Sequence, residues 1–293
     1  MSLVGRWPLT VIVFIVFLTS CFHPCTQDEN NDSPQHQAVD PNDPHGGVQM
    51  GSSNNCDDGK TNLNIDWDPS STEEYTCTEN IREPSNKGLH YSEYEEQPQQ
   101  PRHICYPNKI EYTEDLPTSG PHRPVWPKYG EYKYIPVQRW LHSLEHGAVV
   151  FFYHPCADPD QILAFKYIAK GCLWKHIITP YKKLPPNMNF AILTWRNKLV
   201  LSDPDVEYMV PFIRQHALQA PEGPVSKNGE YEAGLIQKAQ RVSDEKDSDI
   251  CPQMLLMQEG LETIKKHSEF RQMQDEMSQI KLKKIMDNIM TNW

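Results

Sequence analysis

The chain has 293 residues, of which 38% are hydrophobic and 25 are prolines. This apolar content is low for a chain that is folded throughout, so we expect one or two domains accompanied by disordered stretches. The 28 basic and 39 acidic side chains give a net charge of −11, and no Lys/Arg stripe stands out. The composition therefore argues against a nucleic-acid partner, and a solvated acidic surface accounts for the charge.

Residues 1–21 have the pattern of a secretory signal peptide. Arg6 precedes an unbroken apolar run at 11–18, and small residues follow up to Cys21. A membrane span takes ~20 apolar residues, so we expect no transmembrane span after signal removal. The expected location is the secretory pathway or the extracellular space. The alternative is an uncleaved signal that anchors the protein in a membrane, and in a bacterial source Cys21 would suit lipidation.

Residues 22–103 are rich in Asn, Asp, Ser, Gln, Pro and Glu and poor in apolar side chains. Such a segment buries too little surface to offset its ordering entropy. We therefore predict that it is mostly disordered, with local order around 56–77. Asn31 begins the one standard glycosylation sequon, Asn31-Asp32-Ser33, and this segment is exposed enough for it to be used.

The eight cysteines form no C-x-x-C pair, which argues against a structural zinc site or a thioredoxin-type site. Disulfides are the default in an oxidising compartment. Cys156 and Cys172 flank one predicted helix and are a candidate pair that would staple it. Cys56 with Cys77 is a second candidate pair. The connectivity as a whole does not follow from spacing.

Residues 104–225 predict one folded domain. Four runs rich in β-branched, aromatic or aliphatic residues indicate strands at 148–153, 176–180, 190–195 and 198–201. Amphipathic patterns after Asp158 and after Asp203 indicate two helices. Segment 117–136, rich in Pro, Gly and aromatic residues, suits an ordered loop or extended arm. This order predicts an α+β fold, a compact mixed-sheet α/β domain of about 120 residues.

The C-terminal part divides into a polar, acidic linker at 226–251 and an amphipathic helix at 252–293. Apolar residues recur in this helix at spacings of three and four: Phe270, Met273, Met277 and Ile280. The helix either packs on the domain or binds an unknown protein partner. The stripe is short for a coiled coil.

The densest group of chemically active side chains lies between residues 118 and 147. His142 and His146 are four apart and share one face of a helical turn, so they can hold one metal ion with His122 as a third ligand. Imidazole ligands suit a zinc or copper ion. In the alternative, structural interpretation the histidines bond backbone groups, and Glu145 orients one imidazole.

Two catalytic interpretations remain beside these. His142 to His146 reads H-x-x-E-H, the inverted zinc-peptidase pattern, in which Glu145 would be the base of a metal-dependent hydrolase. That chemistry needs a long helix, whereas a glycine and a strand-like run follow the motif at once. Ser119 or Ser143 lies near histidines but lacks the G-x-S-x-G elbow. Cys156 follows a histidine, although a disulfide is the favoured use of this cysteine.

Four motifs occur in order at 116–124 (Leu-Pro-Thr-Ser-Gly-Pro-His-Arg-Pro), 129–132, 142–149 and 193–195. They resemble the mainly bacterial domain of unknown function 3105 over about residues 105–225. Animal relatives in this family are similar to tumour protein p53-inducible protein 13. The resemblance identifies five signature positions without a proven role: Ser119, His122, His142, Glu145 and His146.

The resemblance implies a secreted or membrane-anchored protein. The animal relative is also placed in the cytoplasm and is linked to growth restraint, with no known catalysis. This chain lacks the relative's C-terminal membrane span. The first hypothesis is therefore a secreted, disulfide-bonded binding or regulatory protein, growth-regulating by resemblance, with a metal or ligand site at the three histidines. The alternatives are a metal-dependent hydrolase and an interaction protein that acts through residues 252–293.

Overall fold

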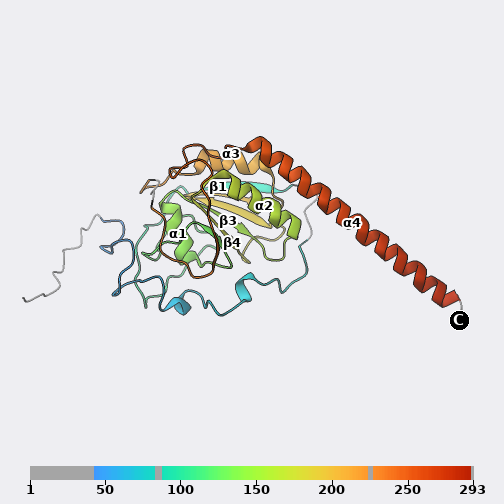
Figure 1. Cartoon of the computed structure of the whole chain (residues 1–293). Coiled ribbons are helices and arrows are strands. Elements are labelled where there is room, and N and C mark those ends of the chain that lie inside the picture. Colours follow the sequence, from blue (N-terminus) through green and yellow to red (C-terminus); the bar gives the residue numbers. More distant parts are fainter. Residues whose placement is uncertain (1–42, 83–87, 224–226, 292–293) are drawn as a thin grey trace, which may run out of the picture. The chain divides into compact units, whose positions relative to one another are not determined.

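The computed structural model describes residues 43–82, 88–223 and 227–291, and within these the side chains of 254–257 and 285–291 are left out (Figure 1). The predicted signal peptide at 1–21 and the sequon at Asn31 lie outside the described residues. The helices, strands and contacts of the fold are counted within the described residues only.

A seven-stranded mixed sheet forms the centre of the domain, in the order β1-β6-β5-β3-β4-β2-β7. The strands are β1 (His90–Tyr94), β2 (Gly130–Tyr132), β3 (Val149–Tyr153), β4 (His176–Pro180), β5 (Phe190–Thr194), β6 (Asn197–Leu201) and β7 (Leu235–Lys238). β4 pairs in parallel with β3 and with β2, whereas every other pairing is antiparallel.

Helices cover both faces of the sheet (Figure 1). The helices on the sheet are α1 (Val137–Glu145), α2 (Pro159–Cys172) and α3 (Val206–His216), whereas α4 (Met254–Thr291) packs on α2. Two 3₁₀ turns, η1 (Leu63–Ile65) and η2 (Glu73–Tyr75), precede the strands. α2 begins where the Asp158 carboxylate accepts from two amides of the first turn, and Asp205 caps α3 by accepting from the Glu207 amide. Short polar caps thus fix where both helices start.

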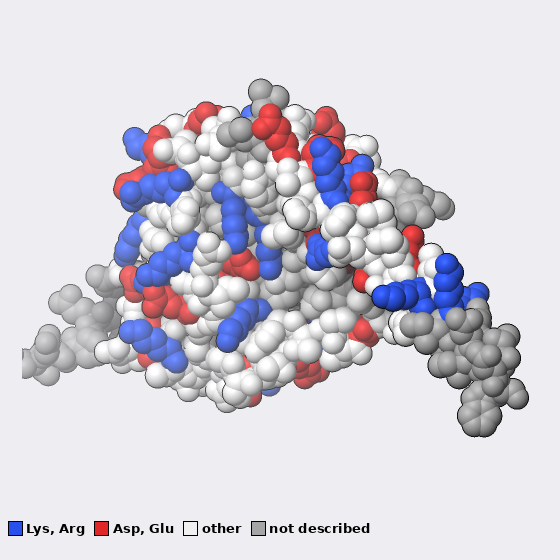
Figure 2. Space-filling model, turned by 45° about the vertical axis from the view of Figure 1, so that its right-hand side comes forward, with Lys and Arg blue, Asp and Glu red and all other residues white. Residues whose placement is uncertain are grey.

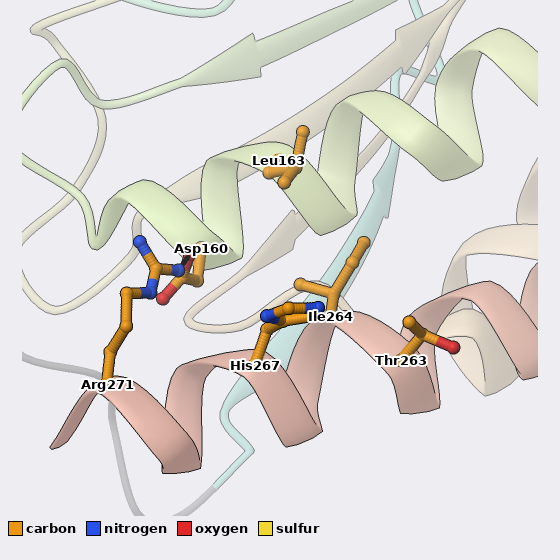
Figure 3. A pocket seen from close by; sticks show the side chains of 6 residues that line it. All are labelled: Asp160, Leu163, Thr263, Ile264, His267 and Arg271. Carbon is orange, nitrogen blue, oxygen red and sulfur yellow. Dashed lines mark hydrogen bonds and ion pairs between the residues drawn. The ribbon is translucent and has the colours of Figure 1, made fainter. Parts of the chain in front are cut away.

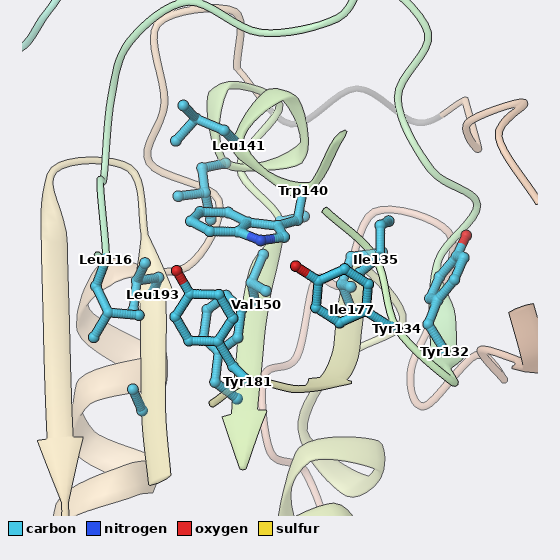
Figure 4. Close-up of a cluster of buried hydrophobic side chains, with 14 of the residues drawn as sticks. Leu116, Tyr132, Tyr134, Ile135, Trp140, Leu141, Val150, Ile177, Tyr181 and Leu193 are labelled. Carbon is cyan, nitrogen blue, oxygen red and sulfur yellow. The ribbon is translucent and has the colours of Figure 1, made fainter. Parts of the chain in front are cut away.

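Alternation along β3 divides the core into two layers. Val150 and Phe152 join the apolar cluster beneath α1, whereas Val149 and Phe151 face α2 and α3. On the α1 side, Trp140 lies edge-on to Phe152, with ring centroids 5.0 Å apart, amid the buried tyrosines of Figure 4. Because α1 is clamped to the sheet by this layer, its last turn has a fixed position.

The α+β prediction is confirmed, and the predicted strands and helices of 148–218 correspond to β3, α2, β4, β5, β6 and α3. The sheet also includes β1 and β7, which lie outside the expected domain boundaries of 104 and 225. β1 pairs along its length with β6, and β7 pairs with β2. The mostly disordered segment expected at 22–103 and the linker expected at 226–251 therefore each contribute an edge strand. Both strands are largely exposed, so they carry little apolar signal.

The disulfides differ from the predicted pairs. They join Cys56 to Cys105, Cys77 to Cys156 and Cys172 to Cys251. All four candidate cysteines are bonded, but the Cys156–Cys172 and Cys56–Cys77 pairings are wrong.

Helix length explains the first error. Cys156 precedes α2, and Cys172 is the last of its 14 residues. A helix of that length spans ~21 Å, whereas a disulfide needs Cα atoms within ~7 Å. In the second case, the Tyr106 amide donates to the Cys56 carbonyl at 3.1 Å, which holds Cys105 rather than Cys77 beside Cys56. Pairing therefore follows tertiary contacts and not proximity along the chain.

The disulfides suggest an extracellular or secretory-pathway protein, because such bonds persist in oxidising compartments. A cytoplasmic location conflicts with them. Within the described ranges, no helix combines the length and the apolar content that a bilayer crossing requires. Figure 2 shows acidic and basic side chains intermixed over the face of the molecule that it presents.

His176 makes the stability of the fold depend on pH. It is buried at the start of β4, its Nδ1 donates to the Leu173 carbonyl at 2.6 Å, and burial lowers its pKa to about 4. An unfolded histidine has a pKa of ~6.5, so between about pH 6.5 and 4 only the unfolded chain binds this proton. The free energy of unfolding therefore falls as pH drops through that window, on the order of 3 kcal/mol from this group.

We expect His176→Gln to show a shallower loss of stability than the wild type between about pH 7 and about pH 4.5, measured by urea unfolding. His267→Gln, which changes an exposed histidine of α4, is the matched control and should keep the wild-type slope. Equal slopes for His176→Gln and the wild type would contradict the assignment.

Candidate functional site

Five histidines and two glutamates from distant parts of the chain gather beside the last turn of α1. α1 supplies His142 and Glu145, and His146 caps its C-terminus. The others come from segments outside the sheet: His45, His103, His122 and Glu222. We call these seven residues the His/Glu cluster. Each contributes to at least one group whose ligand atoms lie within 4.8 Å of one another.

The end of α1 orients three of these side chains. The Gly147 amide donates to the Leu144 carbonyl and the Ala148 amide to the Ser143 carbonyl, both at 2.9 Å, which is the Schellman arrangement. Gly147 has φ of +80°, and a Cβ there would lie 2.9 Å from the Cα of Leu218. Only glycine fits at this end of the helix, and the chain then enters β3 directly. His142, Glu145 and His146 consequently share one helix face.

Three buried imidazoles are held by backbone carbonyls in the same way. Their Nδ1 atoms donate to carbonyl oxygens: His103 to Val48 at 2.7 Å, His122 to Gly120 at 2.9 Å, and His142 to Arg123 at 2.6 Å. A proton on Nδ1 leaves the Nε2 of a neutral ring with a free lone pair. None of the three Nε2 atoms has a hydrogen-bond partner. Metal-binding histidines are fixed by partners of this kind.

Glu145 completes a four-residue group with these three histidines. Its Oε2 lies 3.2 Å from the Nε2 of His122, and its side chain is almost fully buried. A buried carboxylate without a compensating charge is costly. The group therefore places one carboxylate beside three imidazole nitrogens.

Burial keeps two of the imidazoles in the form that binds metals. Desolvation lowers the pKa of His103 to about 3. Desolvation also holds the pKa of His142 well below its ordinary value. Both rings are therefore neutral at physiological pH, as a metal ligand must be.

The remaining three residues, of which two reach solvent, form two further groups beside this one. The Nε2 of His45 is 3.3 Å from Glu145 Oε1 and 3.3 Å from Glu222 Oε1. The Nδ1 of His146 is 2.9 Å from Glu222 Oε2. The side chains of His45 and Glu222 are 17% and 18% exposed, whereas His146 is fully buried. The cluster thus has an inner part and an outer part that reaches solvent.

The structure brings predicted residues together but redistributes them. His122 and His142 lie in one group with Glu145, whereas His146 groups with His142 and Glu222. Sequence reasoning missed His45, His103 and Glu222. The isolated parallel bridge between His103 and His122 unites residues 19 apart, and no local spacing signals such a contact. The one sequence signal for His103 was its position next to residue 104, where the predicted domain begins.

The nucleophile interpretations of Ser119 and Cys156 find no support in the geometry. Ser119 Oγ donates to Glu95 Oε1 at 2.8 Å and accepts from the Gln99 amide at 2.7 Å, so both its roles are structural. Cys156 is bonded to Cys77 and has no free thiol. The aromatic neighbour of the cluster is Trp126, whose ring centroid lies 4.7 Å from that of His146.

Comparison with known proteins gives one match. Residues 103–229 match the family model described as a protein of unknown function (DUF3105), which supports the resemblance to that family. The matched segment contains every residue of the His/Glu cluster except His45. No curated protein and no solved structure matches the chain. The resemblance to p53-inducible protein 13, with the growth-regulating role that it implies, stays a prediction.

Proposed function

We propose that this chain is a metal-binding protein of the secretory pathway that holds a transition-metal ion on His103, His122, His142 and Glu145. The observation that carries the proposal is the shared arrangement of the three histidines. Each is buried, each has its Nδ1 fixed by a carbonyl, and each has an Nε2 without a hydrogen-bond partner. Buried polar atoms in native proteins are almost always satisfied, so three unsatisfied nitrogens beside one carboxylate call for a shared ligand.

The ligand set favours zinc, with copper as the second choice. Three imidazoles and one carboxylate match the nitrogen and oxygen ligands of zinc, which is usually four-coordinate. Copper(II) also accepts such ligands. The six described cysteines are all in disulfides, so no thiolate is offered to select copper(I).

The position of Glu145 supports binding over hydrolysis. A general base must be free to take a proton from a metal-bound water. Glu145 instead lies within the ligand group itself, between His122 and His45, and is almost fully buried. α1 is also only nine residues long and ends at Glu145. The carboxylate is therefore better placed as a ligand than as the base of the H-x-x-E-H pattern.

Metal content tests the proposal. Protein secreted from cultured cells, analysed by elemental mass spectrometry, should carry near-stoichiometric zinc or copper. The double variant His103→Ala/His142→Ala should lose it, whereas His267→Ala, which removes an exposed histidine, should not. Absence of metal from the wild type, or full retention by the double variant, would refute the proposal.

A second function, protein interaction, is supported by α4. Its first half packs against α2, where Leu163 faces Ile264 and Asp160 pairs with Arg271 (Figure 3). From Phe270 onward, four apolar side chains at spacings of three and four are each about half exposed: Phe270, Met273, Met277 and Ile280. Such a stripe suits packing against another helix, and a second copy of α4 offers an identical stripe.

If two copies of α4 pair in this way, Met273→Glu/Met277→Glu should convert a dimer to a monomer in sedimentation experiments. A monomeric wild type would exclude this pairing.

A further inference from the structure

The His/Glu cluster contains more ligands than one ion uses. Zinc takes about four ligands in a structural site, and the inner group already supplies four. His45, His146 and Glu222 remain. They lie in two further groups that share Glu145 or His142 with the inner group. Three additional ligand side chains at one place need an explanation of their own.

The two oxygens of Glu145 face different histidines. Oε2 lies 3.2 Å from the Nε2 of His122, in the inner group, and Oε1 lies 3.3 Å from the Nε2 of His45, in the outer group. A carboxylate in this position can donate one oxygen to each of two ions. The side chain is buried, so solvent does not compete for either oxygen.

Glu222 has a matching arrangement on the outer side. Its Oε1 lies 3.3 Å from the Nε2 of His45, and its Oε2 lies 2.9 Å from the Nδ1 of His146. The Nε2 of His146 is fully buried and has no hydrogen-bond partner. The outer group thus consists of two carboxylates and an imidazole, with a second, unsatisfied imidazole beside them.

The placement of the carboxylates also favours a second cation. The carboxylates of Glu145 and Glu222 both approach His45. An ion on the inner group lies beside Glu145 only, because Glu222 is not a member of that group.

We propose that the His/Glu cluster binds two divalent metal ions, bridged by Glu145. This inference rests on the proposed function. The inner ion lies on His103, His122, His142 and Glu145, and the outer ion lies on His45, Glu145 and Glu222, with His146 orienting Glu222. Its mixed nitrogen and oxygen ligands suit zinc or a similar divalent first-row ion. Because His45 and Glu222 reach solvent, the outer ion exchanges faster than the inner one and keeps a coordination position for water.

The test is the stoichiometry of zinc in purified protein that has been stripped and reloaded with Zn²⁺ alone. We expect two equivalents in the wild type and in the control His267→Ala, and one in His45→Ala/Glu222→Gln. Copper(II)-loaded wild type should show exchange-coupled ions by electron paramagnetic resonance, since bridged ions lie ~3.5–4 Å apart. His45→Ala/Glu222→Gln should show an isolated Cu²⁺ signal.

The outcomes separate this inference from the proposed function. One equivalent in the wild type, unchanged by His45→Ala/Glu222→Gln, would overturn the second position and leave the inner site standing. Two equivalents retained by that variant would overturn the assignment of its ligands. No zinc in a wild type that unfolds cooperatively would overturn both proposals. Circular dichroism of each variant shows whether a loss of metal reflects a loss of fold.

Discussion

Arg139→Met is expected to destabilise the protein by about 3–5 kcal/mol, because it leaves a buried carboxylate without its cation. Arg139 and Asp57 are both fully buried, and two guanidinium nitrogens reach the two carboxylate oxygens at 2.5 and 2.9 Å. The same guanidinium donates to the Val125 carbonyl at 2.8 Å. Methionine retains the unbranched, flexible first part of the side chain and removes every one of these bonds. Urea unfolding, with the slope compared between variants, measures the loss.

Two further variants show that charge burial is the cause. Arg139→Met/Asp57→Asn should recover part of the loss, because the amide carries no charge. Arg241→Met is the matched control. It breaks an ion pair with Glu245 in which both side chains are 58% exposed, and such pairs contribute about 0.5 kcal/mol. If Arg139→Met costs no more than Arg241→Met, the buried pair does not stabilise the fold as argued.

A second buried pair connects this region to the His/Glu cluster. Arg123 is bound to Asp66 and to the carbonyls of Ile104 and Asn108. Its own carbonyl accepts from the Nδ1 of His142 at 2.6 Å. The polar segment at 57–66 therefore fixes the backbone that orients a ligand histidine. This is why a segment so poor in apolar residues is ordered: charge pairs and a disulfide replace the hydrophobic burial that it lacks.

The central strands and helices could be predicted because their signals are local. β3 is a continuous apolar run, and Asp158 is a typical N-cap residue that indicates the start of α2. β1 and β7 could not be predicted in this way. Each is a short edge strand with mostly exposed side chains, and each is stabilised by pairing with a strand far away in sequence. Register with a distant partner leaves no periodic trace in the strand itself.

The residues of the candidate site likewise divide into those with a local sequence signal and those that only distant contacts bring into place. His142 and Glu145 were predictable, because helical spacing brings them to one face of α1. His122 was predicted only by its proximity along the chain. His103 and His45 were missed because tertiary contacts alone place them, their ring centroids 4.5 Å apart and 58 residues apart in sequence. The disulfide errors have the same origin, since spacing along the chain says little about which cysteines meet.

Removing metal from the zinc-loaded protein with EDTA is expected to lower its Tm by about 5–10 °C. A ligand that binds only the folded state adds about 2.7 kcal/mol when it is present at about 100 times its Kd. In a domain of about 200 residues, 1 kcal/mol shifts Tm by about 2–4 °C. The reason lies in the cluster: without an ion, the folded state buries three unsatisfied Nε2 atoms and the Glu145 carboxylate, whereas the unfolded chain hydrates them.

Variants make this shift specific to the cluster. His103→Ala/His142→Ala should have the same Tm with and without EDTA, whereas His267→Ala should respond as the wild type does. The disulfides are untouched by the chelator, so a shift measured by calorimetry reports metal alone. A wild type whose Tm is indifferent to EDTA and to added zinc or copper would mean that the folded state gains nothing from these ions. The carbonyl-fixed histidines would then be structural, bonding backbone groups as the alternative interpretation of the sequence has it.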